Sequence, residues 1–183
     1  MRVTYDTEFI EDGQTIGLIS IALVAEDDGE YYAVNADMPI RRIRRHPWLM
    51  DNVVPGLPQP HGDRRLTMPQ RWLYDYASPL SRRSQRIADE VRNFLANTPD
   101  LELWAWYAAF DHVALAWLWG PMSNLPPGIP MWTNDIRQEA HRLGLTDDDL
   151  PQQEAGVHNA LADARHNLVR LRFLDQVAAE RAA

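Results

Sequence analysis

Residues 15–34 read TIGLISIALVAEDDGEYYAV, and this stretch indicates the kind of fold. The segment from Thr15 to Ala25 is apolar and rich in β-branched residues, which is typical of a strand in the middle of a sheet. Asp27-Asp28-Gly29 has the composition of a hairpin turn, so Glu30 to Val34 can return beside it as the next strand. Residues 2–6 form another strand-like segment before the hairpin. We therefore expect three antiparallel strands to open the domain.

Helix and strand patterns alternate along the second half of the chain. The expected elements are a helix over about 79–96 that starts at Ser78-Pro79, a strand over 101–107, a helix that begins at Asp111 and ends at Gly120-Pro121, a strand over 131–133, a helix closed by Gly144, and a helix over about 159–179. Antiparallel strands followed by alternating helices and strands predict an α/β fold, in which helices cover a mixed sheet.

An Arg- and Pro-rich segment at about 36–78 connects the two halves. Seven of the 13 Pro lie between Pro39 and Pro79, and neither a helical nor a strand period is clear. We interpret the segment as a long loop with short helical turns inside one domain of residues 1–183. Loops of this length inside compact domains are usually functional or disordered.

The composition excludes several kinds of site. Cys is absent, which excludes disulfides, a thiolate nucleophile and a cysteine metal site. No run approaches 18 apolar residues, and no apolar targeting stretch opens the chain. We therefore expect a cytoplasmic protein without a membrane partner.

The formal charge of −8 argues against a nucleic-acid partner, but the charge is unevenly distributed. Residues 39–79 hold seven Arg against three Asp and no Glu, a balance of +4. The seven are Arg41, Arg42, Arg44, Arg45, Arg64, Arg65 and Arg71. All 18 basic residues are Arg, which could serve bidentate phosphate recognition. Because this bias runs along the whole chain, we favour GC-rich codons as its origin.

Four carboxylates, at Asp6, Glu8, Asp111 and Asp163, are candidate metal ligands. Asp6 and Glu8 are two residues apart, so on a strand they project to the same face. Together with two aspartates from later elements they could hold a pair of hard, oxygen-seeking ions. His158 is five residues before Asp163, about 500° of helical rotation, and therefore belongs before the last helix rather than inside it. That place suits a mobile general base better than a ligand.

Three runs carry a resemblance to a known family: YDTEF at residues 5–9, AFDHVAL at 109–115 and HNALADA at 158–164. In order and spacing they resemble the three motifs of the DEDDh 3′-to-5′ exonucleases, which include RNase T, oligoribonuclease and the proofreading subunit of DNA polymerase III. The resemblance implies a ribonuclease H-like fold. It also implies a metal-dependent exonuclease, most similar to small bacterial exoribonucleases, that releases nucleoside 5′-monophosphates.

The resemblance also implies roles for individual residues. Asp6, Glu8 and Asp163 would hold the Mg²⁺ or Mn²⁺ ion that activates water, and Asp6 with Asp111 would hold a second ion beside the leaving group. His158 would be the general base. The implied substrate is the 3′ end of single-stranded RNA, with DNA as a second option, and the implied assembly is a homodimer.

Two sets of residues are candidates for substrate binding. Phe9 directly follows the Asp-x-Glu pair, where the terminal base would lie, so we expect it to stack on that base. The Arg cluster is expected to follow the RNA backbone. Four of its members lie close together in the sequence and are the candidate substrate-binding residues: Arg41, Arg42, Arg44 and Arg45.

Two other functions remain open. An endonuclease or Holliday-type resolvase of the same fold also uses four carboxylates, but His158 ahead of Asp163 favours the exonuclease. A catalytically idle nucleic-acid-binding module would be expected to lack one of the carboxylates, and none is missing.

Overall fold

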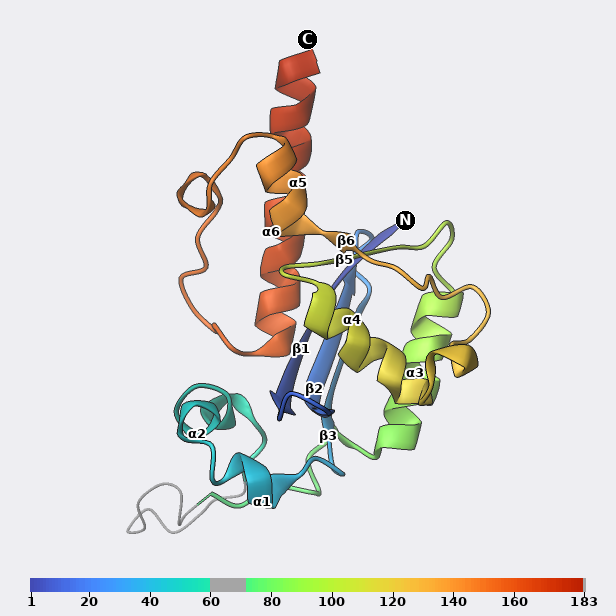
Figure 1. Ribbon diagram of the computed structural model, residues 1–183, viewed down its shortest axis with the longest axis vertical. Coiled ribbons are helices and arrows are strands. Elements are labelled where there is room, and N and C mark those ends of the chain that lie inside the picture. Colours follow the sequence, from blue (N-terminus) through green and yellow to red (C-terminus); the bar gives the residue numbers. More distant parts are fainter. Residues whose placement is uncertain (60–71, 183) are drawn as a thin grey trace.

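The computed structural model describes residues 1–59 and 72–182. A six-stranded mixed sheet lies at its centre, with the strand order β4-β3-β2-β1-β5-β6 (Figure 1). The strands are β1 (Arg2–Glu11), β2 (Ile16–Ala25), β3 (Glu30–Asn35), β4 (Ser81–Arg82), β5 (Glu102–Ala105) and β6 (Asn134–Asp135). β1, β2 and β3 pair antiparallel, whereas β4, β5 and β6 each pair parallel to a neighbour. The expected α/β fold with a mixed, ribonuclease H-like sheet is confirmed.

Helices cover both faces of the sheet. They are α1 (Ile40–Ile43), α2 (Pro47–Asn52), α3 (Ser84–Ala96), α4 (Ala109–Ala116), α5 (Ile136–Arg142) and α6 (Ala160–Ala182), with 3₁₀ turns η1 (Val54–Gly56), η2 (Trp117–Trp119), η3 (Met122–Asn124) and η4 (Asp147–Asp149). Among the residues described, no helix has both the length and the apolar character needed to cross a bilayer.

The alternation of side chains along β1 divides the core into two layers. Val3 and Tyr5 pack with residues of α3 and α4 on one face. On the other face, Ala22 and Val24 of β2 pack against α6, and the hydroxyl of Thr4 donates a hydrogen bond to the Ala164 carbonyl (2.9 Å). Residues at even positions of β1 therefore face α6, which runs along this side of the sheet (Figure 1).

The segment between β3 and β4 contains α1, α2 and η1, which agrees with the expected short helical turns. Residues 60–71, which include Arg64, Arg65 and Arg71, lie outside the described part of the chain. A small core of its own anchors the segment to the sheet. Ile43, Leu49 and Val53 pack there with Ile19 and Val34.

Several expected boundaries were wrong. The helix expected from residue 79 begins at Ser84, because Leu80 first accepts a hydrogen bond from the Val34 N–H and Ser81–Arg82 forms the edge strand β4. The strand expected over 131–133 lies at Asn134–Asp135, where it pairs with β5. Strands of two residues have no sequence period, so only their pairing defines them.

Strand lengths also differed from the expectation. β1 does not end at Asp6 but continues to Glu11, with a shift of register between Glu8 and Phe9. β5 ends at Ala105 rather than at residue 107, because the chain turns through Tyr107 at φ +51° into α4. Trp106 therefore lies in the turn after β5.

Candidate active site

Three of the predicted carboxylates meet between β1 and α6. Asp6 and Glu8 are at even positions of β1 and therefore face α6, and Asp163 lies in the first turn of that helix. Carboxylate oxygens of the three residues all lie within 4.8 Å of one another. The prediction that Asp6 and Glu8 share a face with Asp163 nearby agrees with this geometry.

Burial and mutual repulsion raise the proton affinity of this cluster. Glu8 is only 8% exposed, and burial, together with the nearby charges of Asp163 and Asp111, raises its pKa to about 8. Burial also raises the pKa of Asp6 well above its usual range, with further contributions from Asp111, Glu8 and Asp163. The pKa of Asp163 is raised by burial, although a hydrogen bond from Gln153 Nε2 to its Oδ1 (2.7 Å) opposes the shift. Each carboxylate would ionise more readily beside a cation.

The donor set fits a hard divalent cation. All three groups offer oxygen, which Mg²⁺ and Mn²⁺ prefer, and a bound cation would relieve the repulsion between buried like charges. Within the described chain, none of the three carboxylates forms an ion pair with an Arg or His side chain. Asp6, Glu8 and Asp163 therefore could hold a metal ion.

Asp111 approaches the same region from α4, but one of its carboxylate oxygens is bound to Thr7 of β1. It is the third residue of α4 and not the helix N-cap, which is Ala108. Its Oδ1 accepts hydrogen bonds from the Thr7 N–H (2.8 Å) and the Thr7 hydroxyl (2.6 Å). The Thr7 N–H is free for this bond because β5 pairs only with Arg2, Val3 and Thr4.

These contacts affect the acidity of Asp111. Burial raises its pKa to about 6, and the hydrogen bonds from Thr7 limit the rise. Asp111 is close enough to raise the pKa of Asp6, although it does not belong to the group of three converging carboxylates. One of its oxygens is therefore committed to the strand, while its charge contributes to the cluster.

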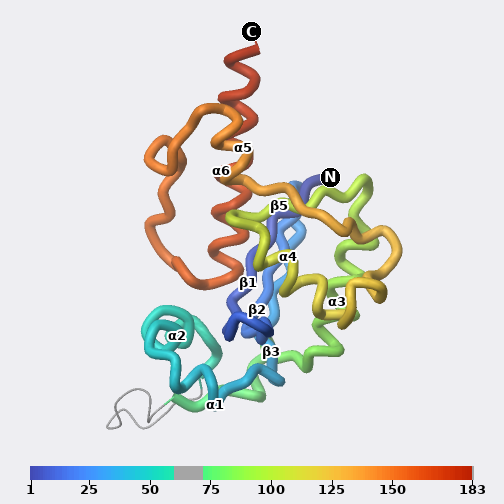
Figure 2. Tube along the Cα trace, viewed as in Figure 1, coloured from blue at the N-terminus to red at the C-terminus, as the bar shows by residue number. Residues whose placement is uncertain are grey.

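His158 lies before α6, as its spacing from Asp163 predicted. It has a left-handed backbone conformation (φ +65°), and the Asn159 side chain accepts a hydrogen bond from the Ala162 N–H (3.2 Å) at the start of the helix. The ring of Trp48, from α2, contacts the His158 ring edge-on, with centroids 4.7 Å apart and planes at 73°. This contact joins the segment after β3 to the start of α6; Figure 2 shows the backbone of α2 near that end of α6.

A cleft of about 280 Å³ brings His158 and two of the carboxylates together. Its lining residues are Asp6, Trp106, Gln153, Val157, His158, Asp163, Asn167 and Arg170. Negative charge, an imidazole and one guanidinium therefore share a cleft large enough for part of a nucleotide.

The candidate substrate-binding residues lie in two places: Phe9 on β1, and the four arginines in and just after α1. Phe9 follows the shift in the β1 register and stacks on Phe110 of α4, with centroids 6.1 Å apart and planes at 19°. Phe110 is 57% exposed, so this aromatic pair borders the surface near Glu8.

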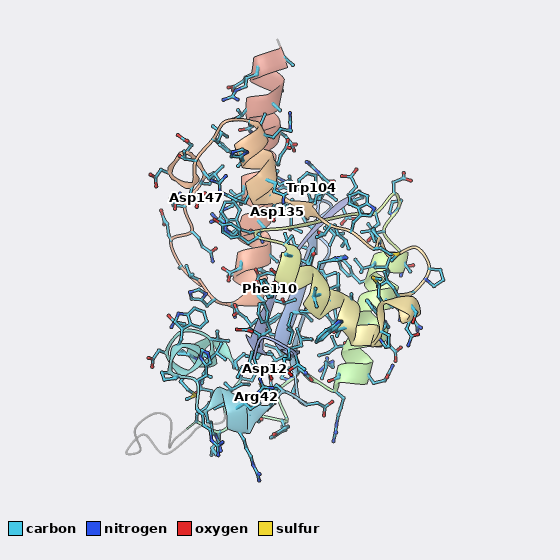
Figure 3. The ribbon with its side chains drawn as sticks, in the orientation of Figure 1. Asp12, Arg42, Trp104, Phe110, Asp135 and Asp147 are labelled. Carbon is cyan, nitrogen blue, oxygen red and sulfur yellow. The ribbon has the colours of Figure 1, made fainter. Side chains whose placement is uncertain are left out.

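The four candidate arginines lie in and just after α1 and differ in their contacts. Arg42 forms an ion pair with Asp12 (3.0 Å), and the two residues lie away from Trp104 and Asp135 in Figure 3. Arg44 donates a hydrogen bond to the Trp72 carbonyl (2.9 Å). Arg41 and Arg45 are exposed. No described contact places any of the four in the carboxylate cleft.

Sequence reasoning missed Trp48, Trp106, Gln153 and Arg170, which contact or line the cleft. Arg170 had a usable signal, because it is seven residues after Asp163 and therefore on the same face of α6. Trp48 and Gln153 had none, since they reach the site from the short helix α2 and from a loop, through contacts that only the fold creates.

Comparison with known proteins identifies two close relatives. Over 176 residues, the chain is 44% identical to the 3′-5′ exoribonuclease of Mycobacterium tuberculosis strain CDC 1551 / Oshkosh and to that of strain ATCC 25618 / H37Rv. Each alignment covers 95% of this chain and 93% of the relative. No family model matches the chain.

Proposed function

This chain belongs to the family of bacterial 3′-5′ exoribonucleases that includes the two mycobacterial proteins, and we propose that it hydrolyses single-stranded RNA from the 3′ end in a metal-dependent reaction. The observation that carries the metal dependence is the convergence of Asp6, Glu8 and Asp163, whose oxygens lie within 4.8 Å of one another. Buried carboxylates this close together repel one another, and a divalent cation bound between them would relieve that repulsion.

The proposal includes the DEDDh assignment and its ligand sets. Asp6, Glu8 and Asp163 would hold one Mg²⁺ or Mn²⁺ ion, and Asp6 with Asp111 would hold the second. When bound, the two ions neutralise charge on the scissile phosphate, acidify the attacking water and stabilise the departing oxygen. The hydrogen bonds from Thr7 to Asp111 Oδ1 fix that carboxylate, so that its Oδ2 is the oxygen left for a ligand.

His158 is the proposed general base. A ring nitrogen of His158 accepts the proton of the attacking water, and the residue's place before α6 allows the ring to move while Asp163 stays held in the helix. Trp48 restricts that movement through its edge contact with the ring.

The remaining proposals concern the substrate and the assembly. The terminal base stacks on the Phe9–Phe110 pair, and Arg41 and Arg45, which are exposed, contact the RNA backbone farther from the 3′ end. The products are nucleoside 5′-monophosphates, and the enzyme acts as a cytoplasmic homodimer; light scattering of the purified chain tests the dimer.

Oligonucleotides with altered ends test the direction of cleavage. One sequence is prepared as 5′-labelled linear RNA, 3′-phosphorylated RNA, circular RNA and linear DNA, and each is incubated with and without Mn²⁺. We expect a ladder of single-nucleotide steps from the 3′ end of linear RNA only when Mn²⁺ is present, with the circle uncut. Rapid cutting of the circle would favour the endonuclease.

Carboxylate variants test the site itself. Asp6→Asn, Asp111→Asn and Asp163→Asn should each nearly abolish hydrolysis while the protein stays folded. Asp175→Asn, on the far part of α6, is the control and should keep its activity. Full activity in one of the first three would remove that residue from the proposed site.

A further inference from the structure

Arg170 is a cationic side chain that lines the carboxylate cleft, and its role is not explained by the proposed metal ligands and base. It lies two turns after Asp163 on α6 and shares the cleft with Asp6, His158 and Asp163. The charges of Asp163 and Asp6 act on it, yet it forms no ion pair with either of them. The position of the Arg170 guanidinium in the cleft is therefore not explained by an ion pair with these carboxylates.

Two other arginines at α6, Arg165 and Arg2, form ion pairs. Arg165, five residues earlier on the helix, forms a bidentate ion pair with Glu30. Arg2 bridges Glu26 and Asp175. Arg172, two residues after Arg170, instead donates a hydrogen bond to the Glu26 carbonyl, so an ion pair is not general on this helix. Arg170 differs from Arg172 because carboxylates line the same cleft and it still does not pair with them.

Trp106 holds it there. The Arg170 guanidinium lies over the Trp106 ring at 4.2 Å from the centroid. Its Nη1 makes one long contact with Asn167 Oδ1 (3.5 Å), and its Nε is buried without any hydrogen-bond partner. Stacking fixes the plane of a guanidinium but leaves its edge donors free, and a buried donor without a partner is unfavourable. Among the described residues, the guanidinium therefore lines the cleft without an ion pair, and its Nε has no acceptor.

A phosphate oxygen would supply that acceptor. Four ionised carboxylates and two divalent ions sum to zero, so a scissile phosphate would bring one uncompensated negative charge into the cleft. The guanidinium provides the matching positive charge and a geometry that suits phosphate oxygens.

On the basis of the proposed function, we propose that Arg170 binds substrate by donating hydrogen bonds to the phosphate of the 3′-terminal nucleotide. Trp106 is a positioning residue that keeps the guanidinium away from the carboxylates, so that its donors stay available to the phosphate.

The test compares two ligands that differ by this phosphate. Adenosine 5′-monophosphate, the kind of product expected from RNA, and adenosine are titrated calorimetrically into the Mn²⁺-loaded protein. Arg170→Met should weaken binding of the monophosphate by about 10- to 100-fold, because charge-assisted hydrogen bonds are lost, and should leave binding of adenosine unchanged. Arg170→Lys, which keeps the charge without the planar fork, should lose less. Arg172→Met, on the exposed side of α6, is the matched control and should change neither affinity.

Other outcomes separate this inference from the proposed function. Wild-type protein that neither binds the monophosphate nor degrades RNA would refute the proposed function. Wild-type binding with equal affinity in Arg170→Met would overturn the role of Arg170 alone. Titration with Mn²⁺ alone addresses a purely structural role: Arg170→Met should bind Mn²⁺ at least as well as the wild type, since a nearby positive charge is removed, and a loss of Mn²⁺ affinity would overturn the assignment. Thermal melting confirms that each variant is folded.

Discussion

Replacing Glu8 by Gln should stabilise the metal-free protein. Glu8 is 8% exposed, and its pKa of about 8 lies above the ordinary value of 4.5. At a pH below 4.5 the Glu8 carboxyl is protonated in both the folded and the unfolded protein, so its ionisation does not change the free energy of unfolding. As the pH rises toward 8, the unfolded chain releases this proton while the folded protein keeps it, so the free energy of unfolding falls.

The size of the effect follows from the pKa difference. At pH 7 the pH is about 2.5 units above the pKa of Glu8 in the unfolded chain, which corresponds to at most about 3.4 kcal/mol against the folded state. Gln carries no charge and has nearly the same shape, so Glu8→Gln should regain much of this energy. For a chain of this size, 3 kcal/mol corresponds to an increase in Tm of roughly 6–12 °C. The difference should vanish near pH 4.5.

Urea unfolding in EDTA at pH 4.5, 6 and 7 measures this directly, with Glu11→Gln as the control, since Glu11 is exposed at the end of the same strand. Adding Mn²⁺ should then reverse the order, because the wild type gains stability from binding and Glu8→Gln gains less. An equal or lower stability of metal-free Glu8→Gln at pH 7 would refute the reasoning, as would a difference that does not depend on pH.

Three further variants test the surroundings of the cluster. His158→Ala should lower turnover by about 10²- to 10⁴-fold with little change in Mn²⁺ affinity, and a large loss of metal binding by calorimetry would instead make His158 a ligand. Trp48→Leu removes the edge contact on that ring and should lower kcat by about 2- to 10-fold at saturating RNA; unchanged kcat would mean that Trp48 does not position His158. The double variant Arg41→Gln/Arg45→Gln should flatten the salt dependence of RNA binding by about one to two units of log–log slope, and an unchanged slope would mean that these arginines do not contact the RNA.

Local patterns were enough to predict the parts of the protein that depend on residues near one another in the chain. The apolar run of β2 and the turn at Asp27–Gly29 predicted the opening hairpin. Alternation along a strand put Asp6 and Glu8 on one face, and helical rotation put His158 outside α6. These predictions depended on the periods of strands and helices, which are properties of the backbone and not of the particular fold.

Contacts between distant segments could not be predicted in the same way. The start of α3 moved to Ser84 because an edge strand of two residues forms only where β3 offers its backbone. Asp111 bonds to Thr7 because β5 does not extend along that edge of β1, which pairs there only with β2. Neither outcome has a local signal, since each depends on which backbone groups the rest of the sheet leaves free.

In the cleft, too, some features could be predicted from the sequence and others depended on contacts between distant segments. From spacing and order along the chain, the sequence alone predicted the candidate carboxylates and the histidine, of which Asp6, Asp163 and His158 line the cleft. Only the tertiary structure brought Trp48 against His158 and Trp106 against Arg170. These pairs are separated by more than 60 residues, and the orientation of each ring depends on packing that the complete fold creates. Residue type and spacing therefore determined which groups could do chemistry, whereas long-range packing decided how those groups are held and which donors stay free.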